Sequence, residues 1–393
     1  MITRRFGRTG LDMPVLSCGG MRYQHSWDDK EEGGISREGQ ANLEACIRKA
    51  LDNGINHIET ARGYGTSEVQ LGRILPLLPR DGMIVQTKVA PASAEEFLGT
   101  FDRSMSNLQL SHVDLLSIHG INNRECWEET IRPGGALEAA RRIIHEGRAT
   151  FLGFSTHAPC DLIEEIIASD IFDYVNLHWY FMNRTNRAAV EAATRHDMGV
   201  FIISPTEKGG CMHQPSEKLS GLCAPYSPIL FNDLYCLTDP LVHTISIGAA
   251  KPSDFDEHLQ AGRMLADPAT PDLVHGIAAR LEEEFLKANG FPIPHRWDAD
   301  LPPFGEVPGA INVQEIRRLW ALDKAFDMQA YGKLRYNLLG NGGHWFPGVN
   351  AAEFDETAIR ELGENAGIPD LATILREAHD RFGDAPRKRL QKD

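Results

Sequence analysis

Four polar residues end or follow short apolar runs in the first third of the chain, and together they could transfer a proton. The runs read INHIE, MIVQTK and VDLLSI, and the four residues are Glu59, Tyr64, Lys88 and His119. If the runs are neighbouring parallel strands of a barrel, their carboxyl ends meet at one rim and the four side chains converge. A tyrosine beside a lysine can donate a proton to a carbonyl, because the positive charge favours the phenolate and lowers the tyrosine pKa from about 10. In this interpretation Glu59 keeps Lys88 charged, and His119 orients the substrate oxygen.

Each of these residues also has an ordinary explanation. Glu59 could close a strand at the surface, and Tyr64, between two glycines, could belong to a turn. Lys88 could face solvent, and His119 could be a buried histidine with satisfied hydrogen bonds. The catalytic interpretation therefore rests on the coincidence of four such residues at four comparable positions.

The elements that must position these residues form an alternating pattern of strands and helices. Eight short apolar runs occur: VLSCGG, INHIE, MIVQTK, VDLLSI, TFLGFS, YVNLHW, GVFIIS and HTISIG. Helical patterns between them cover residues 38–53, 95–108, 136–146 and 187–196. The rival α/β architecture is a doubly wound sheet with G-x-G-x-x-G after its first strand; neither that motif nor a P-loop is present. The sequence therefore predicts a (β/α)8 TIM barrel over residues 1–265.

Composition favours a cytoplasmic protein that acts on a small molecule. The net charge of −15 and the pI near 5.5 argue against nucleic acid and anionic membranes as partners. No apolar run approaches the roughly 20 residues that cross a bilayer, and no apolar signal core follows the basic N-terminus. The seven cysteines show no C-x-x-C spacing, which predicts free thiols in a reducing compartment and no metal site. The sequence leaves open whether the chain forms a homo-oligomer.

The composition changes after about residue 265. Helical patterns at residues 273–289, 313–339 and 370–382 follow one another without strands between them. The sequence therefore predicts a helical C-terminal domain over residues 266–393. No cysteine follows Cys236, so thiolate ligands for an iron–sulfur cluster are missing from this domain.

The segment that contains Tyr64 resembles the signature of the aldo-keto reductase family. The family pattern D-T-A-x-x-Y-G-x-S-E-x-x-L-G stands here at residues 59–72 as ETARGYGTSEVQLG, and only the leading acid differs. The resemblance covers residues 1–260 and implies NAD(P)-dependent interconversion of a carbonyl (aldehyde, ketone or sugar) and an alcohol by hydride transfer. It implies that the family's Asp, Tyr, Lys and His tetrad is Glu59, Tyr64, Lys88 and His119, with Tyr64 as proton donor or acceptor. The extra methylene of Glu59 moves the carboxylate and puts rate or substrate choice in question.

The later strands resemble the cofactor cradle of the family. By this resemblance Ser155, Thr156 and Asn176 hold the nicotinamide carboxamide, and Thr156, in place of the usual Asn, donates one hydrogen bond. The run ISPTEKGG resembles the loop around the pyrophosphate, although Gly209 and Gly210 also fit an ordinary turn. The cofactor-binding set that the resemblance implies is Gly20, Met21, Ser155, Thr156, Asn176, Ser204, Pro205, Lys208, Gly209, Gly210, Gly248, Lys251, Asp254 and His258.

The identity of the nucleotide stays open between NADP(H) and NAD(H). Family members that prefer NADPH often carry an arginine where this chain has Asp254, with Lys251 three residues earlier. A carboxylate repels the 2′-phosphate of NADPH but accepts a hydrogen bond from a free ribose hydroxyl, so NADH is a live alternative. Asp254 also fits the first turn of a helix, where the helix dipole favours an acid.

The C-terminal segment resembles the ferredoxin-like domain attached to some aldo-keto reductases. The similar stretches are AINVQEI, YGKLRY and HWFPG. That domain normally binds [4Fe–4S] clusters through cysteines that this chain lacks, so the resemblance implies a scaffold without a cluster. The alternative is that the protein is a nicotinamide-sensing binding or regulatory subunit on the same fold. Glu59 in place of aspartate would suit a slow enzyme that is used as a sensor. The long connection over residues 23–36 is expected to overhang the rim that carries the site. The one over residues 210–237 is expected to cap the cofactor or substrate, with a passive surface excursion as the alternative.

Overall fold

The computed structural model describes residues 1–28 and 34–389, which form two compact units. Residues 29–33, inside the connection 23–36, and residues 390–393 lie outside the described residues. The first unit comprises Met1–His178, Ala188–Pro205 and Asp233–Thr270, and the second comprises Trp179–Arg187, Thr206–Asn232 and Pro271–Asp393. The sequence assigns the two internal segments of the second unit to the barrel, so these units differ from the predicted domain limits, 1–265 and 266–393. Those limits stay a prediction.

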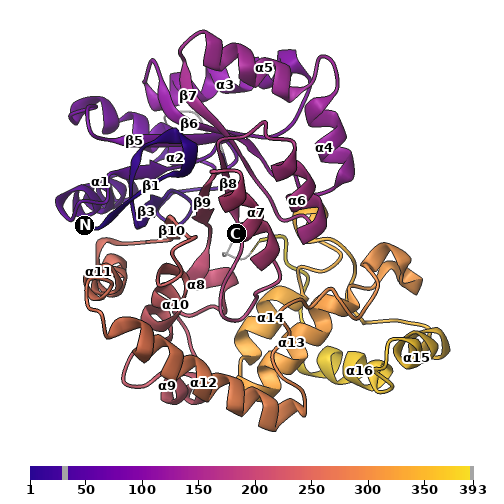
Figure 1. Cartoon of the computed structure of the whole chain (residues 1–393). Helices are drawn as coiled ribbons and strands as arrows, with labels where there is room; N and C mark the ends of the chain where they lie inside the picture. The colour runs from indigo at the N-terminus through magenta and orange to yellow at the C-terminus, as the bar shows by residue number, and fades with distance from the viewer. Residues whose placement is uncertain (29–33, 390–393) are drawn as a thin grey trace. The chain divides into compact units, whose positions relative to one another are not determined.

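The first unit is a closed barrel of eight parallel strands, as the eight apolar runs predict (Figure 1). In chain order the strands are β3 (Leu16–Gly19), β4 (His57–Glu59), β5 (Ile84–Val89), β6 (Val113–His119), β7 (Ala149–Ser155), β8 (Tyr174–Leu177), β9 (Gly199–Ile202) and β10 (Thr244–Ile247). Each strand pairs with the next one, and β10 pairs with β3 to close the barrel. The predicted (β/α)8 fold is confirmed, and the carboxyl ends of β4, β5 and β6 carry the candidate residues.

An antiparallel hairpin that the sequence analysis does not predict fills the opposite end of the barrel. It consists of β1 (Thr3–Arg5) and β2 (Asp12–Pro14). Phe6 and Met13 from this hairpin pack with Tyr174 and Phe201 in one buried apolar cluster. A Cβ atom on Gly199 would lie 2.6 Å from the Phe6 ring, so β9 must begin with a glycine for the ring to fit. Because the amino end of the barrel is filled with side chains, the carboxyl end is the one available for chemistry.

The helices of the first unit follow the strands around the barrel. They are α1 (Arg37–Asp52), α2 (Ser67–Gly72), α3 (Ala94–Leu108), α4 (Arg124–Ile131), α5 (Ala136–His145), α6 (Cys160–Ala168), α11 (Phe255–Met264) and all but the first residue of α7 (Arg187–Arg195). In α3, Ser93 and Glu96 form a reciprocal capping box, and Phe97, Phe101 and Leu108 are buried on one face. A capped start and an apolar stripe of helical period explain why this segment is a helix. Figure 1 shows α3 beside α5, and their residues are in contact.

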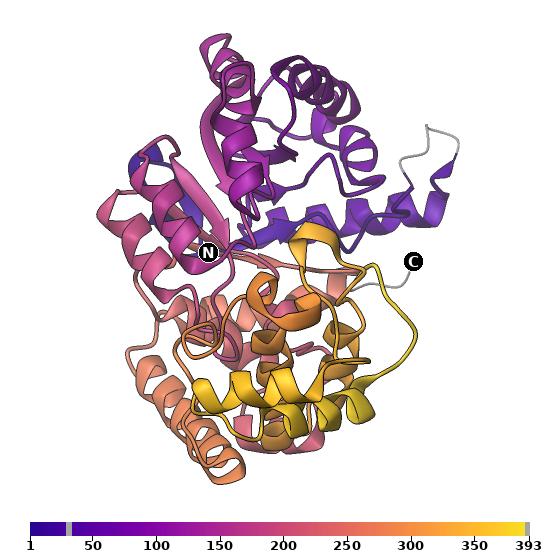
Figure 2. The same cartoon turned by 90° about the vertical axis from the view of Figure 1, so that its right-hand side faces the viewer.

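Helices dominate the second unit. It contains α9 (Glu217–Cys223), α13 (Val313–Phe326), α14 (Gln329–Tyr336), α15 (Glu356–Asn365), α16 (Leu371–Phe382) and all but the first residue of α12 (Thr270–Asn289). Two further helices, α8 (Pro205–Lys208) and α10 (Pro228–Leu237), contribute residues to both units. Figures 1 and 2 show α13, α14, α15 and α16, orange to yellow, as one group of helices.

One helix predicted from the sequence is two helices in the structure. The pattern over residues 313–339 breaks after α13 at Asp327, whose φ of 54° is left-handed and ends the helix. The break turns α14 so that both helices contact α16. Gly332 of α14 lies against Phe382 of α16, where any side chain at that glycine would overlap the ring. Helix α15 is also not among the helices predicted from the sequence.

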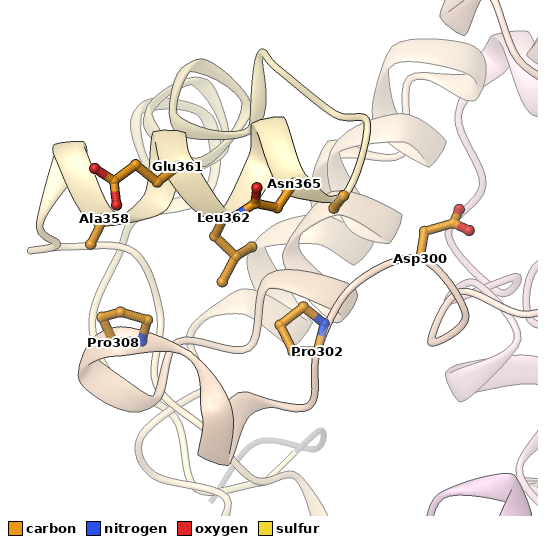
Figure 3. A pocket seen from close by; sticks show the side chains of 8 residues that line it. Asp300, Pro302, Pro308, Ala358, Glu361, Leu362 and Asn365 are labelled. Atoms are coloured by element: carbon orange, nitrogen blue, oxygen red, sulfur yellow. The ribbon is translucent and has the colours of Figure 1, made fainter.

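A shallow cavity of about 500 Å³ lies on the second unit (Figure 3). Its lining residues are Asp300, Pro302, Pro308, Ala358, Glu361, Leu362, Asn365 and Ala366. Every one of them belongs to the second unit, and none is among the predicted site residues.

Three further findings concern the described part of the chain. Within residues 1–28 and 34–389, no helix is long and apolar enough to cross a membrane. In the same residues, no group of three or more histidine, cysteine, aspartate or glutamate side chains is placed to hold a metal ion. All seven cysteines lie in the described residues, and none forms a disulfide.

Candidate active site

Three of the four predicted catalytic residues meet at the carboxyl ends of β4 and β5. The Lys88 ammonium donates hydrogen bonds to the Glu59 carboxylate, to the Thr60 carbonyl oxygen at 2.8 Å and to the Tyr64 hydroxyl at 3.2 Å. Lys88 is 1% exposed and Glu59 is 3% exposed, so this ion pair is buried. Strands β4 and β5 are hydrogen-bonded neighbours, and Glu59 lies opposite Gln86. This pairing brings the side chains of Glu59 and Lys88 together.

His119, the fourth predicted residue, ends the adjacent strand β6 beside Tyr64. The two rings meet edge to face, with centroids 5.6 Å apart and an interplanar angle of 84°. The Tyr64 loop is fixed by its backbone: the Arg62 N–H donates to the Lys88 carbonyl at 3.0 Å, and the Tyr64 N–H donates to the Ala61 carbonyl at 3.0 Å. Gly65 has a φ of 51°, and any side chain there would overlap Ser26, so the turn after Tyr64 requires glycine.

Burial shifts the pKa values of the two proton-bearing groups in opposite directions. Burial lowers the pKa of Lys88 below its ordinary value, and the Glu59 carboxylate in contact with the ammonium opposes this by favouring the charged form. Burial also raises the pKa of Tyr64 above its ordinary value of 10. Burial of the phenol therefore acts against the lowering of the Tyr64 pKa that the sequence predicts from the lysine charge. Tyr64 therefore carries its proton at neutral pH.

Asn176 on β8 has the environment of a residue that awaits a ligand. It is fully buried, and neither its amide nitrogen nor its amide oxygen has a hydrogen-bond partner among the described residues. A buried amide without hydrogen bonds lowers the free energy of unfolding by about 1–3 kcal/mol, so such groups are rare in native proteins. A ligand carboxamide offers one donor and one acceptor and would satisfy both atoms. The residue therefore fits the carboxamide of a nicotinamide.

Ser155 and Thr156, the other two predicted carboxamide contacts, differ in what they offer. Ser155 lies opposite Asn176 in the pairing of β7 with β8, and its hydroxyl oxygen accepts from the Gly120 N–H at 3.0 Å. That bond leaves the Ser155 hydroxyl proton for another acceptor. The Thr156 hydroxyl donates its single proton to the Ile121 carbonyl at 2.6 Å. The expected hydrogen bond from the Thr156 hydroxyl to a carboxamide therefore has no proton in this structure.

The residues predicted after β3 and β10 lie at the same rim. A Cβ atom on Gly20 would lie 2.6 Å from the Glu59 carbonyl oxygen, so the chain passes close to the proposed catalytic acid. The Gly248 carbonyl accepts from the Arg22 guanidinium at 3.1 Å, next to Met21. Gly20, Met21 and Gly248 therefore belong to one side of the rim.

The residues predicted for the adenosine end have structural partners of their own. One carboxylate oxygen of Asp254 accepts from the N–H groups of Ala250 at 2.9 Å and Lys251 at 3.3 Å, which is the helix-start role considered as its alternative. His258 is buried and paired with the buried Asp233. Burial opposes the charge of His258, but the charge and hydrogen bond of Asp233 outweigh burial and raise its pKa. Contact of these residues with a nucleotide stays a prediction.

The predicted pyrophosphate loop is divided between the two units. Ser204 and Pro205 belong to the first unit, whereas Lys208, Gly209 and Gly210 belong to the second. Ser204 has a φ of 52°, an uncommon backbone conformation for a residue with a side chain.

Lys208 lies among aromatic and basic groups of the second unit. Its carbonyl accepts from the Tyr331 hydroxyl at 2.8 Å, and its ammonium lies 5.2 Å from the centre of the Trp345 ring. Burial and the nearby charge of Arg335 lower the pKa of Lys208 to about 7.

A set of buried polar residues that was not predicted from the sequence lies one layer below the candidate catalytic groups. His57 and Gln86 lie two positions before Glu59 and Lys88 and are fully buried. The sequence does contain a signal for these residues. Residues two positions apart in a strand share one face, so a second polar residue two positions before Glu59 or Lys88 faces the same side as the site. An otherwise apolar run with two polar residues two positions apart contains that signal.

Comparison with known proteins agrees with this geometry. The family model described as Aldo/keto reductase family matches residues 15–218. L-glyceraldehyde 3-phosphate reductase of Escherichia coli (strain K12) is 28% identical over 316 residues, covering 66% of this chain and 86% of the relative. Morphine 6-dehydrogenase of Pseudomonas putida is 29% identical over 209 residues, covering 51% of this chain and 64% of that relative. The holo form of an aldo-keto reductase from Bacillus halodurans has the same fold, with a TM-score of 0.57, 19% identity and coverage of 71% of this chain and 96% of that one.

The family model spans more than half of the chain, and the solved structure shares its barrel. The family's reductases and dehydrogenases use NAD(P) as the redox partner of a carbonyl or an alcohol. The chain belongs to the aldo/keto reductase family and is an NAD(P)-dependent carbonyl/alcohol oxidoreductase.

Proposed function

We propose that this enzyme reduces a small carbonyl compound, an aldehyde, ketone or sugar, at the carboxyl end of the barrel and oxidises the corresponding alcohol in reverse. The nicotinamide, when bound, supplies or accepts the hydride. Tyr64 donates the proton to the carbonyl oxygen, and His119, edge-on to the tyrosine ring, holds that oxygen. Lys88 stabilises the phenolate left behind by donating to the Tyr64 oxygen.

The observation that carries the proposal is the double contact of Lys88. Its ammonium bonds to the Glu59 carboxylate on one side and to the Tyr64 hydroxyl on the other, at 3.2 Å. Desolvation of a buried lysine ammonium costs several kcal/mol of folding free energy. Buried charged groups of this kind are therefore concentrated at functional sites. Glu59 compensates this charge, and Lys88 directs its remaining field at the proton donor.

The cofactor would be held at β7 and β8. The unpaired amide of Asn176 and the available Ser155 hydroxyl proton fit the carboxamide of the nicotinamide. The choice between NAD(H) and NADP(H) depends on residues after β10, including Asp254 and Lys251. Free thiols suit a reducing compartment, so we place the enzyme in the cytoplasm.

Replacing Tyr64 by phenylalanine tests the proposal. The Tyr64→Phe variant should bind NAD(P)H with a Kd close to that of the wild type, because it loses only the hydroxyl group. Its kcat should fall by about 10²–10⁴-fold, the usual contribution of a general acid. A panel of aldehydes, ketones and aldoses identifies a substrate first, and fluorescence of the bound nicotinamide reports Kd. An unchanged kcat on a substrate that the wild type turns over would remove Tyr64 as the proton donor.

A further inference from the structure

Six buried polar side chains form one continuous hydrogen-bonded chain through the interior of the barrel. They come from six of its eight strands and are all fully buried: Thr244 on β10, Ser17 on β3, His57 on β4, Gln86 on β5, Ser117 on β6 and Tyr174 on β8. The links are Thr244 Oγ1 to Ser17 Oγ at 2.7 Å, Ser17 Oγ to His57 Nδ1 at 2.6 Å, His57 Nε2 to Gln86 Oε1 at 3.1 Å, Gln86 Nε2 to Ser117 Oγ at 2.9 Å, and Ser117 Oγ to Tyr174 OH at 2.9 Å.

The path from Ser117 to Tyr174 passes across the intervening strand β7. Gly153 of β7 makes this possible, because any side chain at that position would overlap the Tyr174 ring. The hydrogen bond between Ser117 and Tyr174 therefore depends on a glycine in β7, the strand between β6 and β8.

The inventory of protons fixes the direction of the central bonds. The Gln86 amide nitrogen donates to Ser117, so its amide oxygen must accept from the Nε2–H of His57. Burial lowers the pKa of His57 and keeps its ring neutral, so the other ring nitrogen is an acceptor; Ser17 donates to it and in turn accepts from Thr244. His57 is thereby specified as the neutral Nε2–H tautomer. Burial lowers the pKa of His57 to about 3, its hydrogen bond with Gln86 raises it, and the charge of Lys88 lowers it further.

This chain lies directly below the proposed catalytic groups. His57 and Glu59 are two positions apart on β4, and Gln86 and Lys88 are two positions apart on β5, so both pairs face the same side of the sheet. The bond between His57 and Gln86 therefore crosses between the same two strands as the Glu59–Lys88 ion pair, one layer lower.

We propose that His57 and Gln86 are positioning residues for the reaction: their bond fixes β4 against β5 so that the Lys88 ammonium meets both Glu59 and Tyr64. The inference rests on the proposed function, in which Lys88 acts on Tyr64. A fully satisfied polar network rigidifies a core and specifies one arrangement of it, which apolar packing does less strictly.

The neutral state of His57 also favours the contact of Lys88 with Glu59 and Tyr64. Glu59, Tyr64 and His57 interact with the Lys88 ammonium, and the titratable ring of His119 lies beside Tyr64. A positive His57 would repel the ammonium and compete with it for the single carboxylate, so the neutral tautomer leaves Glu59 to Lys88 alone.

Two substitutions of His57 separate its two bonds. His57→Gln places an amide nitrogen near the Nε2 position and retains the donor to Gln86, whereas His57→Asn places its amide near Nδ1 and retains only the partner Ser17. We expect His57→Gln to keep kcat within about threefold of the wild type. We expect His57→Asn to lower kcat at least tenfold and to move the pH profile of kcat by about one unit, because a displacement of about 1 Å can cost up to ~10²-fold. The Kd for NAD(P)H should stay within about threefold in both.

Two more variants serve as matched comparisons. Thr244→Val removes the hydroxyl at the far end of the chain, leaves the His57–Gln86 bond intact, and should leave kcat within about twofold. Gln86→Glu keeps the acceptor for His57 but introduces a carboxylate below Lys88. This second acid competes with Glu59 for the ammonium, so the pH profile of kcat should shift although the protein stays folded.

The results can overturn the proposal in defined ways. If His57→Asn lowers the melting temperature but has the kcat and pH profile of the wild type, the chain has only a structural role. If His57→Asn does not fold, an unshifted pH profile for Gln86→Glu overturns the proposal instead. Nitrogen NMR of the wild type should show His57 as the Nε2–H tautomer, and the Nδ1–H form would contradict the deduced direction without any assay of activity. Wild-type kcat in Tyr64→Phe would refute the proposed function itself and is measured first.

Discussion

Replacing Asn176 by leucine should have opposite effects on the protein without and with its cofactor. Leucine has nearly the shape of asparagine but no polar atoms. In the protein alone, the change removes a fully buried amide whose nitrogen and oxygen both lack hydrogen-bond partners within residues 1–28 and 34–389. The desolvation cost of such a group is about 1–3 kcal/mol, so the free energy of unfolding should rise by about that amount. For a chain of this size about 2 °C per kcal/mol is expected, which gives an increase in Tm of roughly 2–6 °C.

With the cofactor, the sign reverses. Loss of the two hydrogen bonds to the carboxamide should weaken binding by about 1–3 kcal/mol, which raises Kd about 5–150-fold. At a cofactor concentration of 100 times the wild-type Kd, the wild type gains about 2.7 kcal/mol of stability from binding. A variant with a 30-fold higher Kd gains about 0.9 kcal/mol at the same concentration. The stabilising effect of the cofactor should therefore shrink to about a third.

Thermal unfolding with and without NADH and NADPH measures both effects in one experiment. Ser117→Ala is the matched control, because it removes a buried hydroxyl that has two partners, Gln86 and Tyr174. That control should lower Tm without cofactor and leave the cofactor-induced increase unchanged. If Asn176→Leu also lowers Tm without cofactor and keeps the full cofactor-induced increase, the amide of Asn176 is not a waiting ligand contact, and the argument from its unpaired atoms fails.

Three further predictions concern Glu59, Asp254 and the pair of Asp233 with His258. Glu59→Asp shortens the arm that holds Lys88; steady-state kinetics should show kcat changed at least severalfold in either direction, and an unchanged kcat and pH profile would separate Glu59 from the reaction. Asp254→Arg should change the difference between the binding free energies of NADPH and NADH by about 1–3 kcal/mol in favour of NADPH. Fluorescence at fixed ionic strength measures both Kd values, and an unchanged ratio would show that Asp254 serves only as a helix cap. The raised pKa of His258 means that its pairing stabilises the fold fully below the unfolded pKa of about 6.5 and that this stability is lost as pH rises through the higher folded pKa. Urea unfolding should therefore show a gap between wild type and Asp233→Asn that is larger at pH 6 than at pH 9, and a gap that grows with pH would contradict this assignment.

The sequence predicted the features that depend on local pattern. Each run of apolar residues became a barrel strand because alternating short strands and amphipathic helices allow few other folds. Glu59, Lys88 and His119 could be placed at one rim because strand ends are visible in sequence and the barrel brings them together. Tyr64 lies near them because the signature around it requires a fixed turn, seen here in the positive φ of Gly65.

The features that sequence could not predict depend on contacts between distant segments. The left-handed residue Asp327, which ends α13, carries only a weak local signal, because aspartate adopts this conformation more often than most residues but seldom does so. The raised pKa of Tyr64 follows from burial, a property of the folded protein alone. The donation of the Thr156 hydroxyl proton to the Ile121 carbonyl joins two neighbouring strand ends and has no local signal in the sequence. The partnership of Ser17 with His57 and Thr244 likewise joins three strands that only the closed barrel makes adjacent.

The closure of the barrel has a consequence for how the protein is made. The first barrel strand, β3, pairs with the last, β10, through Leu16 and Ile245, partners about 230 residues apart in the chain. On a ribosome that releases the amino end first, one edge of β3 must remain unpaired until β10 has been synthesised. An open strand edge invites pairing with other chains, and short edge strands are one way in which proteins limit that risk. With only four residues, Leu16–Gly19, β3 offers little edge to a neighbouring nascent chain during this wait.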